Sequence, residues 1–138
     1  MIKVRRNVFE TNSSSMHSLS VIGSDRMTTL ENKDGVVVVS YGEFGWGYDS
    51  LTTPTEKLSY LITQYSEDED ILETIKEAVF DYTGLKMVIY ESKTDYWEKG
   101  YIDHQSQGMI SEYITDKQSI IDIVFNDKNV IVIDNDNH

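Results

Sequence analysis

The sequence predicts an α+β fold in which a mainly antiparallel sheet packs against a central helical hairpin, with a third short helix near the C-terminus. Two capped amphipathic segments follow each other in the middle of the chain, and segments with the composition of β-strands lie towards both ends. The 138 residues are 39% hydrophobic, with one proline and no internal repeat, which is typical of one domain with one core. We therefore predict that residues 1–138 form a single domain.

The first predicted strands lie at residues 2–9 and 18–23, on either side of a polar turn at 10–15. Four consecutive valines at 36–39 follow an Asp-Gly turn and predict a buried strand. The glycine-rich stretch 41–48 is predicted as the loop that ends this strand.

A helix is predicted to begin after Thr53. Thr53 is the expected N-cap, Pro54 occupies the first helical position, and Glu56 completes a capping box that satisfies free backbone amides. The apolar face of this helix then follows at helical spacing: Leu58, Leu61, Ile62 and Tyr65.

A second helix is predicted directly after the first. Ser66 is the expected N-cap, with Glu69 as its capping-box partner, and Gly84 stands where a C-terminal glycine cap is expected. The predicted buried stripe comprises Ile71, Ile75, Ala78, Val79 and Tyr82. The two helices should pack as a hairpin on the sheet.

The C-terminal part of the chain predicts further strands. Residues 86–91 form one, 96–102 its hairpin partner, and 130–133 a strand that is apolar on both faces and therefore central. Asp116 is the expected cap of the third helix, although the apolar residues at 121–125 also alternate as in a strand.

Charge is distributed unevenly along the chain. The net charge is −12, yet the first 26 residues hold four basic and two acidic side chains, so the remainder, with eight basic and 22 acidic, contributes −14. Such a surface repels bare nucleic acid and favours a basic partner. Alternatively, the acidity only keeps a small protein in solution.

The absence of cysteine excludes disulfides and thiolate metal sites and is typical of the cytosol. No apolar run approaches the length of a membrane span, and the first residues contain no apolar signal region. We predict a cytoplasmic protein, with no membrane contact and no direct contact with nucleic acid. The sequence leaves the oligomeric state open.

The second predicted helix bears an acidic stripe. Carboxylates at 67–70 stabilise the macrodipole of a helix N-terminus, but the acidity continues along the helix at a spacing of four residues. The stripe should point outward as a protein-binding surface, and it comprises Glu69, Glu73, Glu77 and Asp81. Trp46 and Trp97 lie in predicted loops, either as interface anchors or as lids on the core.

The segment 7–18 is unusually rich in hydroxyl groups. Together with the cations Arg5 and Arg6 just upstream, it could bind a phosphate or an oxyanion. Alternatively, its polar side chains only cap a local turn. Its candidate residues are Asn12, Ser13, Ser14, Ser15 and His17.

A second polar group lies at Asp103 and His104. With His17 and a serine of the first segment, it supplies the side chains of a Ser-His-Asp centre, although the chain has no nucleophile-elbow motif. The alternative is a hairpin turn. A metal site formed by Glu10, His17, Asp103 and His104, or by the tail 134–138, lacks known ligand spacing, so we predict no metal and no cofactor.

Three stretches carry a resemblance to known sequences. The motif Phe-Glu-Thr-Asn-Ser-Ser-Ser-Met-His-Ser at 9–18, the motif Tyr-Ile-Asp-His-Gln-Ser at 101–106, and the pairs at 125–126 and 134–136 resemble small uncharacterised proteins of bacteriophages and mobile elements of Firmicutes. The resemblance implies such an origin and brings no activity with it.

Two functional classes follow from these observations. The first is a phage- or mobile-element-encoded acidic binding protein, such as an anti-CRISPR-like inhibitor that occupies a basic nucleic-acid-binding surface of a host protein. The second is a small hydrolase, transferase or ligand-binding domain for a phosphorylated or nucleotide substrate. The first is favoured because the charge is a property of the whole chain, whereas the second needs a geometry that no motif guarantees.

Overall fold

The structure is a computed structural model that describes residues 15–21, 24–30, 32, 34–44, 49–90, 101–102 and 113–135; for 15–17, 101–102 and 134–135 it describes the backbone only. The predicted strand at 2–9 lies outside the described residues. Helices and strands occur together in an α+β fold, which confirms the predicted class.

An antiparallel sheet forms one side of the fold. Its strands are β1 (Ser15–Val21), β7 (Asn129–Asn135) and β4 (Asp49–Leu51), in the order β1-β7-β4. The central place of β7 confirms the prediction from its two apolar faces. Ile131 and Ile133 are fully buried, whereas Val132, also predicted to be buried, is half-buried. Its cross-strand neighbours are Ser18 and Ser50, whose short side chains cover it only in part.

Two further strand pairs are parallel. β2 (Val36–Ser40) pairs with β5 (Lys86–Tyr90), and β3 (Glu43–Phe44) pairs with β6 (Tyr101–Ile102). The stretch 41–48, predicted as a loop, therefore contains β3. The predicted hairpin between 86–91 and 96–102 is wrong for the described residues, because β5 pairs with β2. The connection from β2 to β5 includes two helices and brings the chain back in the same direction, so the two strands are parallel.

Helix α1 (Pro54–Gln64) begins as predicted. The Glu56 amide donates to Thr53 Oγ1 at 3.2 Å, and the Thr53 amide donates to Glu56 Oε1 at 3.2 Å. Leu58, Leu61 and Ile62 are fully buried, which confirms these three positions of the predicted apolar face. Tyr65, the fourth, is the C-cap and is half-buried.

Helix α2 (Glu69–Thr83) begins two residues later than predicted, because its N-cap is Asp68 and not Ser66. The Ser66 amide still donates to the Thr63 carbonyl at the end of α1, and the Asp68 amide donates to the Tyr65 carbonyl. Residues 65–67 are thus held in a turn, and the carboxylate of Asp68 accepts from the Ile71 amide at 3.1 Å. Gly84 ends the helix in the left-handed conformation, with φ of 77°, as predicted.

The buried stripe of α2 is narrower than predicted. Ile75, Ala78 and Val79 are buried, but Ile71, in the exposed first turn, is half-buried. Tyr82 is 39% exposed at the edge of the core, where its ring packs on Phe125 with centroids 4.7 Å apart.

Helix α4 (Lys117–Phe125) is capped by Asp116. The segment is therefore a helix, as the cap predicted, and not a strand. It packs against both α1 and α2, and its last residues lead into β7. Because it is covered on several sides, its apolar residues are buried all round: Ile120, Ile121, Ile123, Val124 and Phe125. This explains why the sequence also resembles a strand.

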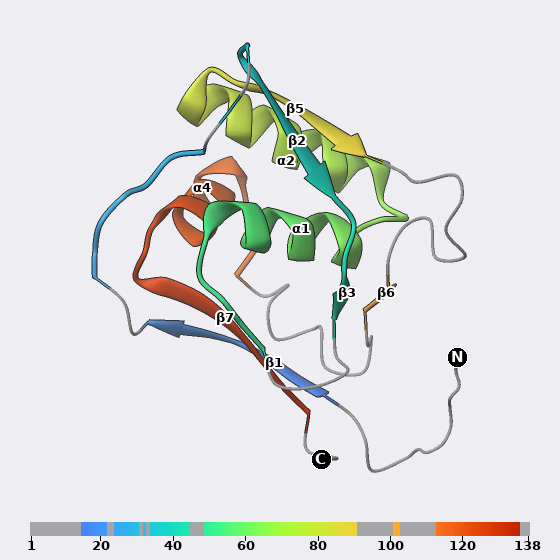
Figure 1. Cartoon of the computed structure of the whole chain (residues 1–138), viewed down its shortest axis with the longest axis vertical. Helices are drawn as coiled ribbons and strands as arrows, with labels where there is room; N and C mark the ends of the chain where they lie inside the picture. Colours follow the sequence, from blue (N-terminus) through green and yellow to red (C-terminus); the bar gives the residue numbers. More distant parts are fainter. Residues whose placement is uncertain are drawn as a thin grey trace.

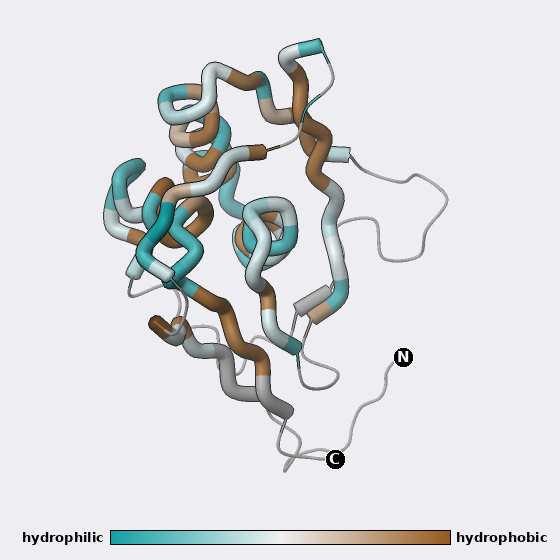
Figure 2. Tube along the Cα trace, turned by 60° about the vertical axis from the view of Figure 1, so that its left-hand side comes forward, coloured by the Kyte–Doolittle hydropathy of each residue, from teal (hydrophilic) through white to brown (hydrophobic). Residues whose placement is uncertain are grey.

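In Figure 1, α1 and α4 lie between the β2–β5 pair and the β1–β7–β4 sheet, and α2 runs beside β5. The trace is hydrophobic along β2 and β7, whereas along the helices hydrophobic and hydrophilic residues alternate (Figure 2). The core therefore lies around α1 and α4, and the outer face of α2 is left to solvent.

Candidate protein-binding surface

The acidic stripe of α2 faces solvent. All four of its carboxylate residues, Glu69, Glu73, Glu77 and Asp81, are exposed. The opposite face of the same helix is buried through Ile75, Ala78 and Val79. The predicted orientation is thus confirmed.

Two lysines compensate the negative charge in the C-terminal part of this stripe. Lys117, at the start of α4, places its Nζ 2.8 Å from Asp81 Oδ2 and 4.0 Å from Glu77 Oε1. The hydrogen bond and the charge of Asp81, followed by the charge of Glu77, raise the pKa of Lys117. Lys76 Nζ lies 3.6 Å from Glu73 Oε2. These pairs are exposed, so they reduce the local charge more than they stabilise the fold.

The carboxylates at the N-terminal end of α2 are not compensated by nearby cations of the described residues. In the part of the chain that the structure describes, neither Glu69 nor Asp70 lies within ion-pair distance of a cation. Both stand in the first helical turn, where the macrodipole favours anions. The uncompensated charge of the stripe is therefore concentrated here.

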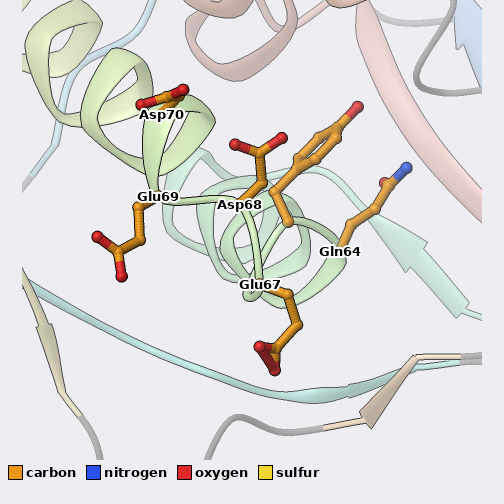
Figure 3. Close-up of a pocket in the computed structure, with 6 residues that line it drawn as sticks. Gln64, Glu67, Asp68, Glu69 and Asp70 are labelled. Carbon is orange, nitrogen blue, oxygen red and sulfur yellow. The ribbon is translucent and has the colours of Figure 1, made fainter.

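An open depression of about 490 Å³ lies beside this helix end. Figure 3 shows that the carboxylates of Glu67, Asp68, Glu69 and Asp70 point in different directions instead of converging. Among the described residues, no group of three His, Cys, Asp or Glu side chains could hold a metal ion. The arrangement forms a diffuse negative surface at the start of α2.

Most residues proposed for anion binding or catalysis lie outside the described part of the chain. Ser15 and His17 are placed by their backbone alone, as β1 residues opposite Asn135 and Ile133. The Ser-His-Asp centre, the phosphate site and the aromatic anchors thus stay predictions. The residues outside the described ranges are Arg5, Arg6, Glu10, Asn12, Ser13, Ser14, Trp46, Trp97, Asp103 and His104.

One charged group was missed by the sequence reasoning. Lys57 of α1 is fully buried, and its Nζ donates to the carbonyl oxygens of Asn129 at 2.8 Å and Asn126 at 3.3 Å. Burial lowers the pKa of Lys57 to about 8, against the opposing charges of Asp127 and Asp122. An amine with a lowered pKa can act as a nucleophile, but this one is buried and directed at two backbone carbonyls. Its role is to hold the connection between α4 and β7.

Comparisons with protein-family models, curated proteins and solved structures give no match for this chain. No helix in the described ranges has the length and apolar character needed to cross a bilayer. The case for a function therefore depends on the surface itself.

Proposed function

We propose that this chain is a non-enzymatic binding protein whose α2 helix occupies a basic, nucleic-acid-binding surface of a partner protein. One observation carries the proposal: a helix buried on one face presents a row of exposed carboxylates on the other, at intervals of one turn. Four residues correspond to about 6 Å along a helix axis, close to the distance between successive phosphates of a nucleic-acid strand.

The charge of the whole chain supports the same partner class. A net charge of −12 in 138 residues attracts basic surfaces and speeds their association at low ionic strength. Because Lys117 and Lys76 compensate the rest of the stripe, Glu69 and Asp70 should contribute most to this attraction.

The sequence resemblance to phage and mobile-element proteins narrows the class of partner. A nucleic-acid-guided defence protein in the host cytoplasm has a basic groove and is a target for an acidic inhibitor. We therefore extend the proposal to an anti-defence role of the anti-CRISPR type.

The experiment measures displacement of a fluorescein-labelled DNA duplex from a purified RNA-guided DNA-binding effector by fluorescence anisotropy. The parent protein should displace the DNA. Glu69→Gln with Asp70→Asn should need about tenfold more protein, because both lost charges are uncompensated. Asp34→Asn with Glu43→Gln is the control, since it removes two exposed charges away from the first turn of α2.

The control variant should displace DNA nearly as well as the parent. Equal losses in the two variants would mean that bulk charge, and not the α2 surface, causes the displacement. No displacement by the parent would contradict the proposed partner class.

A further inference from the structure

A groove of about 410 Å³ separates α2 from β5. Figure 1 shows these two elements running beside each other. Residues 86–89 of β5 form one wall. One face of the helix, with members three and four residues apart, forms the other: Glu69, Leu72, Glu73 and Lys76.

The groove follows the edge of β5 and not one of its faces. Successive residues of a strand point to opposite faces, so a groove lined by four residues in a row must run along the strand's side. No residue of β2 itself lines it, although Tyr41, which directly follows β2, and Ser66 do. Within the described part of the chain, β5 pairs with β2 alone, so this side is the edge that faces away from β2.

The backbone groups at this edge can be assigned from the strand register. The Lys86 amide donates to the Gly35 carbonyl at 3.0 Å, so the backbone groups of Lys86 point towards β2. Because these directions alternate along a parallel strand, the N–H and C=O groups of Met87 and Ile89 point into the groove. An extended peptide placed there could pair with them.

An added strand would also cover apolar surface. Val38, Val88 and Tyr90 are 57%, 39% and 55% exposed on the outer face of the β2–β5 pair. Parallel strands are usually buried on both faces. A new neighbour for β5 would place alternate side chains beside Val88 and Tyr90.

Two carboxylates, Glu69 and Glu73, and two lysines, Lys76 and Lys86, line the groove. Because side chains alternate along a strand, Lys86 lies on the exposed outer face of β5, and the carboxylates prevail only on the side of α2. Side chains of an added strand that point towards α2 would meet Leu72, with Glu69 and Glu73 beside it. Lysine and arginine fit this position, because their aliphatic stems pack on an apolar residue while their charged ends reach carboxylates. Lys76 already lies beside Glu73, so Glu69 is the principal anchor.

We propose that the groove between α2 and β5 binds an extended segment of the partner protein, with lysine or arginine at alternate positions, by adding it as a strand to β5. This inference rests on the proposed function, since it takes the partner to be basic. It adds the mode of contact: backbone pairing at β5 together with charge pairing at α2.

The test uses a blocked synthetic peptide of alternating valine and lysine, long enough to span β5, and a matched peptide of alternating valine and glutamate. Binding to the ¹⁵N-labelled full chain is followed by NMR. The lysine peptide should shift the amide resonances of Met87 and Ile89 and slow their hydrogen exchange. The glutamate peptide should leave both amides unchanged.

Two variants separate backbone pairing from charge. Ile89→Pro removes the amide that points into the groove without removing a hydrogen bond to β2, and it should weaken the lysine peptide about fivefold or more relative to Ile89→Ala. Glu69→Gln should also weaken it. If Ile89→Pro fails to fold, the amide shifts and exchange rates of the parent protein decide the question alone.

Three results would overturn the inference. Amides of Met87 and Ile89 that exchange slowly before any peptide is added would show that the edge is already paired. Shifts confined to α2 would show that the peptide binds the acidic stripe alone, which leaves the proposed function intact. Absence of peptide binding would reject the groove, while the DNA displacement measurement would still decide the proposed function independently.

Discussion

Lys57 illustrates how one side chain can join distant parts of the chain. It comes from the first turn of α1, yet its ammonium group donates to carbonyls on both sides of the turn that links α4 to β7. The Asn126 carbonyl also accepts from the Asn129 amide at 3.1 Å, so the ammonium adds a charged donor to a turn that already has a backbone hydrogen bond. Burial of Lys57 disfavours the charged form of the amine, and this lowers its pKa to about 8.

The stability of the protein should therefore rise with pH above 8. Between the folded pKa of about 8 and the ordinary lysine value of 10.5, the unfolded chain binds a proton that the folded chain has lost. The free energy of unfolding should increase by about 2 kcal/mol between about pH 8 and pH 9.5. Urea denaturation at a series of pH values measures this.

The measurement should stop below about pH 10, where tyrosine titrates in the unfolded chain. Burial raises the pKa of Tyr60, so above that pH its effect on stability has the opposite sign. Lys57→Met is the control: it should be less stable, because the hydrogen bonds from Nζ to the Asn126 and Asn129 carbonyls are lost, and its stability should not rise over the same range. A rise of equal size in this variant would assign the effect to another group.

Helix-capping patterns predict the helix ends correctly at some residues and wrongly at others. Thr53, Asp116 and Gly84 were predicted from caps that depend on a few neighbouring residues, and all three are confirmed. Ser66 fits the same capping-box pattern, but hydrogen bonds from the end of α1 hold it in a turn. The burial of Lys57 depends on a turn about 70 positions further along, and no local pattern contains that information.

At the scale of elements, α2 carries both the proposed binding surface and a cap that can be tested. Asp68→Ala removes the carboxylate that accepts from the Ile71 amide and should lower the free energy of unfolding by about 1 kcal/mol. Ser66→Ala should change it by less than about 0.5 kcal/mol. Urea denaturation of both variants provides the comparison. A larger loss for Ser66→Ala would place the helix start where the sequence pattern put it.

The pairing of strands was harder to predict than their positions. The segments that become β2, β5 and β7 are visible as apolar runs, and the two apolar faces of β7 correctly indicated its central place. The partner of β5 was mistaken, because the nearest later strand segment suggested a hairpin while the observed partner precedes two helices. The groove beside β5 depends on this pairing, so the sequence contained no direct signal for it.

For the whole molecule, the acidic stripe could be predicted because the helical period fixes both faces of α2 once its apolar face is known. The ion pair between Lys117 and Asp81 could not be predicted, since Lys117 begins α4, 36 residues after Asp81 in the chain. The net charge of −12 already includes every lysine and arginine, so twelve carboxylates remain in excess whatever ion pairs form. Repulsion among carboxylates should therefore act on folding and binding together.

Added sodium chloride should affect these two properties in opposite directions. Between about 0.05 and 0.5 M salt, the Debye length falls from roughly 14 Å to roughly 4 Å. Repulsion within the folded chain therefore weakens, and the thermal unfolding midpoint should rise. Attraction to a basic partner weakens as well, and DNA displacement should require more protein. Glu69→Gln with Asp70→Asn should reduce both salt effects, because it removes uncompensated charge from one place. An unfolding midpoint that falls with salt would show that ion pairs such as Arg26–Asp127 and Lys117–Asp81 outweigh the repulsion. The net negative charge would then no longer explain binding to a basic surface.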